Sequence, residues 1–412
     1  MGENELDDAV LPVYIARVVH REDSRREGTR RWEAGIDEWT ETALGKVVEI
    51  AVLIPGVGPG GSGVIKKDAA KDAGGKFPEP GFWETLKETF SGTGRPLDCV
   101  QAEVTSRCPG RCTYCPHTVL QEKWISRDMD MDTFSRLWPL MRHSTRVHLQ
   151  GWGEPLLNPA FFDMAALARK AGCQVSTTTC GLRMDEEVAL KIVKSGIDIV
   201  AFSLAGADAQ SNASRRGVDF DRACEAVSML QAVRRKHTAV HLEIHFAYLL
   251  LASNMEALRG LPALMQRLGV HAAVISTLDY IPDPALAAEA IMPQEAGNLE
   301  KASAILAETA AEAKRLDLDF HYDLPKPDSA GTTCRENICR SVFISADGSV
   351  SPCVYVNLPA DVADPARRVF GNIRGQEPLA IWESEDFQRF RDSLALGQPD
   401  RPCQGCPKRF MR

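Results

Sequence analysis

The sequence predicts an α/β fold followed by a small hairpin-plus-helix segment. Six strand-then-helix units succeed one another between Asp98 and Asp319, which favours a parallel sheet with helices outside it. Such a sheet is either open and doubly wound or a whole or partial barrel. The length of 412 residues suits about two to three domains, and the 44% hydrophobic content is ample for a buried core.

Each unit begins with a strand pattern and continues with an amphipathic helix pattern. The expected strands are Val100–Thr105, Arg146–Gln150, Gln174–Thr179, Asp198–Leu204, Val240–Leu250 and Ala272–Thr277. The expected helices are Met131–Arg142, Phe161–Ala171, Glu186–Ser195, Asp221–Arg235, Met255–Leu268 and Gln294–Leu316.

Polar residues alternate with apolar ones on three of these strands. In the fifth strand, His241, Glu243 and His245 face one side of the sheet while apolar residues face the other. The first two strands repeat the alternation at Gln101, Glu103 and Thr105 and at Arg146, His148 and Gln150. We expect a wet interior suited to a polar ligand. The alternatives are a solvent-exposed sheet face and a metal ion bound by the fifth-strand residues.

The two ends of the chain depart from the repeating pattern. Residues 1–95 form an extension without an assigned role, with an expected strand at Val47–Ile54 and a glycine-rich connector at Pro55–Gly63. In the C-terminal part, Asp347-Gly348 predicts a tight hairpin between Ser341–Ile344 and Ser349–Ser351, before a helix at Leu379–Leu394. We expect domains at residues 96–325 and 326–412.

Charge and composition exclude several classes of protein. The net charge of −8 gives no electrostatic footprint for nucleic acid, and no apolar run approaches the ~20 residues of a membrane helix. The N-terminus is acidic, unlike a secretory signal. We therefore expect a soluble cytoplasmic protein. In that compartment, a clustering of the twelve cysteines favours metal binding or catalysis over disulfides.

The first cysteine group, Cys108, Cys112 and Cys115, has the spacing C-x3-C-x2-C on the loop after the first strand. Three thiolates can ligate three corners of a cubane iron–sulfur cluster and leave the fourth iron open for a substrate. Loops at the carboxyl ends of strands carry the chemistry in βα folds. The alternative is a zinc site completed by His117 or another cysteine.

This region resembles the radical S-adenosylmethionine (radical SAM) superfamily from Asp98 to about Asp319. The cysteine spacing with Tyr114 before the last cysteine matches the family signature. Gly151-Trp152-Gly153-Glu154 matches its glycine-glycine-glutamate motif, with Trp152 as an unusual second residue. The resemblance implies that this edge binds the amino group of the ligand's methionine. It also places Ser203 and Arg216 near the ligand, with Arg215 able to replace Arg216.

The resemblance implies a partial (β/α)6 TIM-like barrel and a [4Fe-4S] cluster that binds S-adenosylmethionine. A reducing partner such as flavodoxin or ferredoxin would supply one electron, and reductive cleavage would give a 5′-deoxyadenosyl radical. Cys180 ends the third strand, where the substrate is expected, and is a candidate functional thiol.

The second cysteine group resembles the auxiliary-cluster domains called SPASM and twitch. Its members are Cys334, Cys339, Cys353, Cys403 and Cys406. Pairing of the hairpin arms is expected to bring Cys339 close to Cys353. We expect one auxiliary [4Fe-4S] cluster held by four of the five thiols, with Cys334 or Cys339 as the spare. A zinc ribbon is the alternative.

The resemblance favours an enzyme that modifies a peptide or protein. The second hypothesis is the maturation of a tungsten- or molybdenum-type metal cofactor, and a small-molecule substrate is a further alternative. A rival of another class is a non-catalytic electron carrier or cluster scaffold, which would have two ordinary four-cysteine clusters.

Overall fold

The computed structural model describes residues 95–237, 241–292, 296–325 and 334–409. The expected strand at Val47–Ile54 and connector at Pro55–Gly63 lie outside these residues, as does Val240. Among the described residues, no helix combines the length and apolarity needed to cross a membrane.

The described residues form one ten-stranded sheet in the order β10-β9-β8-β1-β2-β3-β4-β5-β6-β7. All neighbouring pairs from β1 to β7 are parallel. These strands are β1 (Leu97–Ala102), β2 (Ser144–His148), β3 (Gln174–Thr179), β4 (Ile199–Leu204), β5 (Glu243–Leu250), β6 (Ala272–Thr277) and β7 (Asp319–Tyr322). The α/β prediction is confirmed, and β7 adds a seventh parallel strand to the six expected.

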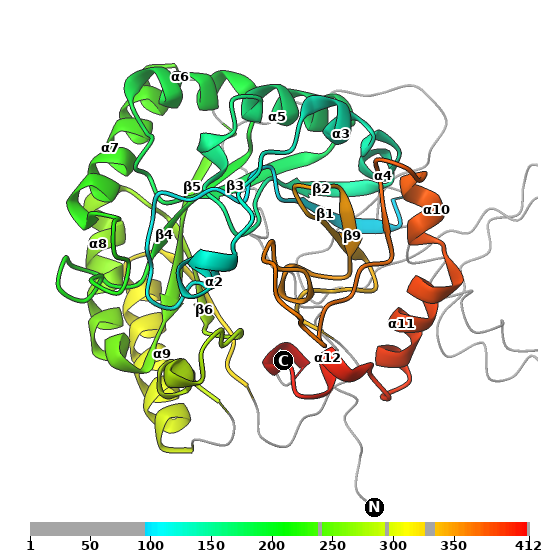
Figure 1. Ribbon diagram of the computed structural model, residues 1–412. Helices are drawn as coiled ribbons and strands as arrows, with labels where there is room; N and C mark the ends of the chain where they lie inside the picture. Colours follow the sequence, from blue (N-terminus) through cyan, green and yellow to red (C-terminus); the bar gives the residue numbers. More distant parts are fainter. Residues whose placement is uncertain (1–94, 238–240, 293–295, 326–333, 410–412) are drawn as a thin grey trace, which may run out of the picture. The chain divides into compact units, whose positions relative to one another are not determined.

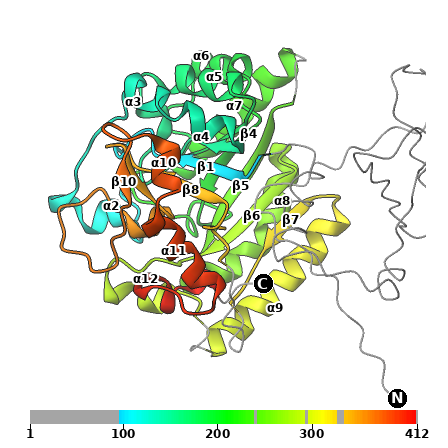
Figure 2. The same cartoon turned by 90° about the vertical axis from the view of Figure 1, so that its right-hand side faces the viewer.

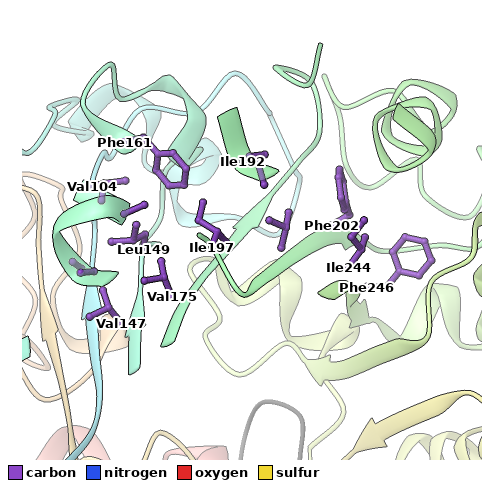
Figure 3. Packing of buried hydrophobic residues seen from close by; sticks show 14 of the residues in the cluster. Val104, Val147, Leu149, Phe161, Val175, Ile192, Ile197, Phe202, Ile244 and Phe246 are labelled. Atoms are coloured by element: carbon purple, nitrogen blue, oxygen red, sulfur yellow. The ribbon is translucent and has the colours of Figure 1, made fainter. Parts of the chain in front are cut away.

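Helices cover the outer face of this curved sheet (Figure 1). They are α3 (Met131–Ser135), α4 (Trp138–Arg142), α5 (Phe161–Lys170), α6 (Glu186–Ser195), α7 (Phe220–Lys236), α8 (Leu261–Leu268) and α9 (Ala296–Arg315). Apolar residues of the strands, such as Val175, Phe202 and Ile244, are almost fully buried against apolar helix residues such as Phe161 and Ile192 (Figure 3). This packing leaves the alternate strand residues on the inner face.

The inner face of the sheet is polar, as expected. His148 hydrogen-bonds through Nδ1 to Ser176 Oγ at 2.9 Å and through Nε2 to Gln150 Oε1 at 2.8 Å. The Gln101 amide donates to the Gln150 carbonyl at 3.1 Å. Along β4 and β6 the helix-facing residues are buried, whereas Ala201, Ser203, Val274 and Ser276 on the inner face are half-buried. The interior at these strands is therefore partly accessible rather than tightly filled.

The C-terminal segment extends the same sheet. Strand β8 (Ser341–Ile344) pairs in parallel with β1, and β9 (Ser349–Ser351) forms the expected antiparallel hairpin with β8. Gly348 in the hairpin turn has φ +87°, which favours glycine. Strand β10 (Gly371–Asn372) follows, and Figure 2 shows the helices α10 (Pro378–Trp382), α11 (Glu385–Ala395) and α12 (Arg401–Gln404) on this side.

The remaining elements are short and lie in the loops. They are α2 (Pro116–Val119) and the 3-10 helices η2 (Gln121–Lys123), η3 (Pro155–Leu157), η4 (Ala252–Gly260), η5 (Pro284–Glu289), η6 (Val354–Val356) and η7 (Pro407–Arg409).

Candidate functional site

The three cysteines of the first group lie on the loop that follows β1. Gly110 separates two of them, and a Cβ atom at Gly110 would lie 3.5 Å from Cys108 Sγ and 3.7 Å from Cys112 Sγ. The two sulfur atoms therefore converge on one side of the loop. The loop backbone is anchored because Arg111 N–H donates to the Arg216 carbonyl at 2.6 Å.

The environment of these thiols suits a metal cluster. Burial raises the pKa of Cys108 to about 11 and that of Cys115 to about 12, so both thiols keep their protons in the metal-free protein. Backbone N–H groups of Gly110 and His117 donate to these two sulfurs. Iron would displace the thiol protons on binding, and N–H donors to sulfur are a usual feature of iron–sulfur sites. The donor set fits the cluster expected from the sequence.

No three His, Cys, Asp or Glu side chains in the described ranges are grouped so as to hold a single metal ion. The metal site considered at His241, Glu243 and His245 is not formed. His241 is exposed, while Glu243 and His245 hydrogen-bond to each other at 2.8 Å. A four-iron cluster differs from a single ion because it takes its thiolates at separate corners.

The Gly151–Glu154 segment lies against the extension of β1, where its two glycines are required. A Cβ at Gly151 would overlap the Glu103 side chain, and a Cβ at Gly153 would overlap the carbonyl oxygen of Thr105. The close approach puts this segment directly beside the chain that leads into the cysteine loop.

The Glu154 carboxylate is buried, with 3% of the residue exposed. Its Oε1 accepts a hydrogen bond from Thr179 Oγ1 and its Oε2 accepts one from Cys180 N–H, both at 2.7 Å. The carboxylate therefore joins the end of β2 to the end of β3. Its negative charge also lies near Cys108.

Cys180 is buried between the motif glutamate and the cysteine loop. Burial raises the pKa of its thiol, and the charges of Glu154 and Cys108 raise it further. The thiol is therefore protonated at neutral pH. The structure brings Cys180 to the first cysteine group, near Cys108.

Arg215, and not Arg216, lies at the cysteine loop. Its guanidinium is buried and donates through Nη1 to Tyr114 Oη at 3.0 Å, with Cys112 and Cys180 also near its charge. The side chain of Arg216 is exposed, and only its carbonyl contacts the loop. Of the two arginines considered from the sequence, Arg215 is therefore the one whose side chain lies at the cysteine loop. Ser203 is half-buried on the inner face of β4.

Four members of the second cysteine group are linked as electrostatic neighbours. Cys334 lies near Cys403 and Cys406, and Cys353 lies near Cys334 and Cys406. Burial raises the pKa of all four thiols. Cys339 is exposed, and its charged neighbours are Arg391 and Asp392. Consecutive turns at residues 334–340 lie between Cys334 and the start of β8, with Asn337 N–H donating to the Cys334 carbonyl and Arg340 N–H to the Asn337 carbonyl. Of the two candidates for the spare cysteine, Cys339 is thus the one in the more exposed environment.

The auxiliary segment, residues 334–409, contacts residues that directly follow three parallel strands. Lys408 Nζ lies 2.9 Å from Asp279 Oδ2, after β6, and Arg335 forms an ion pair with Asp323, after β7. Trp152 Nε1–H, after β2, donates to the Val354 carbonyl at 3.3 Å. The auxiliary thiols therefore lie at the carboxyl ends of the strands, as does the first cysteine loop.

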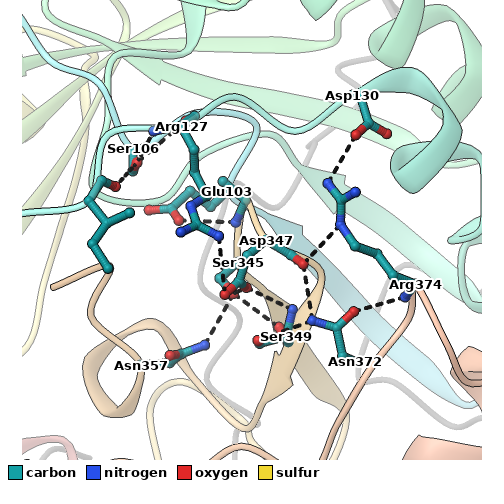
Figure 4. Close-up of polar contacts among 12 residues, drawn as sticks. Glu103, Ser106, Arg127, Asp130, Ser345, Asp347, Ser349, Asn357, Asn372 and Arg374 are labelled. Carbon is teal, nitrogen blue, oxygen red and sulfur yellow. Dashed lines mark hydrogen bonds and ion pairs between the residues drawn. The ribbon is translucent and has the colours of Figure 1, made fainter. Parts of the chain in front are cut away.

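Glu103 and Lys408 are site residues that sequence reasoning missed. Glu103 is fully buried and lies beside Ser345 and Asp347 of the hairpin turn (Figure 4). Its two oxygens accept from Trp152 N–H at 3.0 Å and from Ala346 N–H at 3.1 Å. Burial raises the pKa of this carboxyl to about 7. Polar alternation did place Glu103 on the inner face, but no local pattern indicates a partner more than 200 residues away.

Comparison with known proteins identifies both regions. Residues 102–246 match the Radical SAM superfamily, and residues 334–407 match SPASM, an iron-sulfur cluster-binding domain. The chain contains a radical SAM domain and a SPASM domain. A radical SAM domain implies S-adenosylmethionine and a [4Fe-4S] cluster, and a SPASM domain implies auxiliary iron–sulfur binding.

Two curated relatives and one solved structure illustrate the similarity. The PqqA peptide cyclase of Gluconobacter oxydans is 25% identical over 74% of this chain and 81% of its own length. The tungsten-containing aldehyde ferredoxin oxidoreductase cofactor-modifying protein of Pyrococcus furiosus is 23% identical over 70% of this chain and 82% of its own. The fold of native anSMEcpe with bound AdoMet and Cp18Cys peptide superposes with a TM-score of 0.53 at 16% identity, covering 72% of this chain and 83% of that one.

Proposed function

We propose that this radical SAM enzyme cleaves S-adenosylmethionine reductively in order to modify a peptide or protein. The main observation that supports this proposal is that Cys108, Cys112 and Cys115 lie on one loop, beside Glu154 and Arg215. The three thiolates would hold the [4Fe-4S] cluster, which when bound supplies the electron that cleaves the C–S bond and yields a 5′-deoxyadenosyl radical.

The chain's own residues would bind and orient the cofactor. The Gly151–Glu154 edge offers backbone carbonyls and a carboxylate to the methionine ammonium, while the Arg215 guanidinium offers a positive charge to its carboxylate. Tyr114 accepts from Arg215 and so fixes the guanidinium beside the cluster loop. The polar inner face, including Ser203, provides space where a radical and a polar substrate group can meet away from bulk water.

Cys334, Cys353, Cys403 and Cys406 would hold one auxiliary [4Fe-4S] cluster. Residues 96–325 would then constitute the radical SAM barrel and residues 326–412 the auxiliary-cluster domain, although β8 continues the sheet of the barrel across this boundary. A flavodoxin or ferredoxin would supply the electron.

Similarity to a peptide cyclase, and to a solved structure that holds a peptide, supports a peptide or protein substrate. The second candidate is the maturation of a tungsten- or molybdenum-type cofactor, which is favoured by the cofactor-modifying relative.

The proposal is tested by anaerobic reconstitution with iron and sulfide, followed by dithionite and S-adenosylmethionine. We expect release of 5′-deoxyadenosine, and we expect Cys112→Ala to abolish it while the far-ultraviolet circular dichroism is unchanged. An iron-loaded wild type that releases no 5′-deoxyadenosine would favour the electron-carrier alternative. Zinc bound at the first cysteine group would exclude both the radical SAM activity and the electron-carrier alternative.

A further inference from the structure

Trp152, the unusual second residue of the motif, is held at both its backbone and its side chain. The backbone N–H donates to Glu103 Oε1 at 3.0 Å. The indole Nε1–H donates to the Val354 carbonyl at 3.3 Å. Val354 directly follows Cys353 and begins η6, so the motif and the auxiliary loop are joined through one side chain.

The indole ring also packs against two tyrosines from distant segments. Its centroid lies 6.0 Å from that of Tyr355, in an edge-on arrangement, and 6.0 Å from that of Tyr280, in a tilted one. Tyr280 follows β6 and Tyr355 belongs to η6, and their own centroids are 6.5 Å apart. Aromatic pairs at these separations and tilts are attractive.

The backbone contact of Trp152 leads to a second part of the auxiliary segment. Glu103 accepts from Trp152 through Oε1 and from Ala346, in the β8–β9 turn, through Oε2. Figure 4 shows this carboxylate beside the hairpin turn, where Asp347 accepts from Ser345 at 2.6 Å and lies 3.6 Å from Arg127. The motif is therefore tied to the hairpin turn through Glu103 and to the loop after Cys353 through the indole.

We propose that Trp152 is a positioning residue that holds the Cys353–Val356 loop against the S-adenosylmethionine edge and so fixes the separation of the two cysteine groups. This inference rests on the proposed function for what the groups bind. A glycine at this position would keep the backbone bond to Glu103 but lose every contact to η6. A tryptophan suits this position because its indole is long enough to reach η6 and carries the N–H that bonds the Val354 carbonyl.

The size of the effect follows from the contacts. Trp152→Phe removes one N–H donor and keeps a ring, so local opening of the loop should rise about fivefold. Trp152→Gly removes the hydrogen bond and both ring contacts, so opening should rise about a hundredfold. Trp138 of α4 is exposed and gives a matched control, Trp138→Phe.

The first test is hydrogen–deuterium exchange of the purified protein, read on peptides that cover residues 353–357. We expect exchange to follow the order wild type, Trp152→Phe and Trp152→Gly, from slowest to fastest, while Trp138→Phe equals wild type. The thermal midpoint should fall by only a few degrees in Trp152→Gly, because the lost contacts are few and the sheet core is untouched. Equal exchange at 353–357 in wild type and Trp152→Gly would overturn the proposal.

The second test uses the reconstituted, reduced protein and the microwave-power saturation of its electron paramagnetic resonance signals. Each cluster speeds the spin relaxation of the other to a degree that falls steeply with their separation. Trp152→Gly should saturate at lower power than wild type, and Trp152→Phe should be close to wild type. Identical saturation in all variants would refute a fixed separation set by Trp152. Failure of wild type to load iron would count against the proposed function alone, because the exchange test needs no cluster.

Discussion

Replacement of Lys408 by methionine should destabilise the protein strongly. Lys408 is 4% exposed, and its Nζ lies 2.9 Å from Asp279 Oδ2 and 3.3 Å from Glu336 Oε1. The side chain of Asp279 is 2% exposed. Methionine keeps most of the apolar stem but removes the positive charge, which leaves a buried carboxylate without its counter-charge. Breaking such a pair costs about 3–5 kcal/mol of the free energy of unfolding.

Urea unfolding of the metal-free protein under reducing conditions measures this cost for Lys408→Met, Asp279→Asn and the double variant. The double variant should lose less than the sum of the single losses, by about 1–3 kcal/mol, because the two residues are in contact. Lys191→Met is the matched control, since its ion pair with Glu187 is exposed on α6 and should contribute nothing measurable. A Lys408→Met protein as stable as Lys191→Met, or strictly additive losses, would refute the ionic argument.

Three further outcomes are expected. Cys339→Ser should keep the iron content of the reconstituted protein, whereas Cys353→Ser should lose the auxiliary cluster. An equal loss of iron in the two variants would indicate that Cys339 is a cluster ligand. Arg215→Met should raise the KM for S-adenosylmethionine at least tenfold and Arg216→Met should not, as measured by 5′-deoxyadenosine release; the reverse order would contradict the role proposed for Arg215. The pKa of Glu103 is raised by burial from 4.5 to about 7, so its stabilising contribution is full below pH 4.5 and is lost as pH rises through 7. The difference in unfolding free energy between wild type and Glu103→Gln should therefore change by about 3 kcal/mol between pH 4.5 and 8. Parallel pH curves for the two proteins would exclude this contribution of Glu103 to the pH dependence of stability.

Strands with strong apolar patterns were predictable from the sequence, and interruptions of helices were harder to place. The strands Gln174–Thr179 and Ala272–Thr277 and both hairpin arms have the predicted bounds. The expected helix Met131–Arg142 is divided into α3 and α4 because Pro139, near the start of α4, has no N–H for a continuous helix. Likewise, the predicted helix Leu379–Leu394 is divided into α10 and α11. Ser384 caps the start of α11, where its side chain accepts a hydrogen bond from Phe387 N–H.

The parallel pairing of β8 with β1 was not predictable from local pattern. Residues Val342 and Ile344 pair with Val100 and Ala102, more than 200 residues earlier in the chain. Periodicity indicates that a strand forms and which face it buries, but it does not name the neighbouring strand. Strand β7 was missed for a related reason, because its four residues are too few to show an alternation.

For the candidate site, the sequence revealed groups that are close together along the chain and missed those that meet only in space. The spacing of Cys108, Cys112 and Cys115 lies within eight residues. By contrast, the choice of Arg215 over Arg216 depends on which of two adjacent side chains turns inward to Tyr114. The different environments of Cys334 and Cys339 likewise depend on the turns at residues 334–340, because the cysteine spacing alone does not give the direction of these turns.

The two cysteine groups occupy the same end of the sheet for a topological reason. All the parallel strands have their carboxyl ends at the same edge of the sheet. The loop after β1 therefore leaves the sheet at the same edge as the residues that follow β2, β6 and β7. The auxiliary segment has its contacts at three of these ends, through Trp152, Asp279 and Asp323. Because β8 pairs with β1, this segment begins as a further strand of the sheet that carries the first loop. Both cysteine groups therefore lie at the carboxyl ends of the parallel strands, and under the proposed function a substrate bound at these ends would lie near each of them.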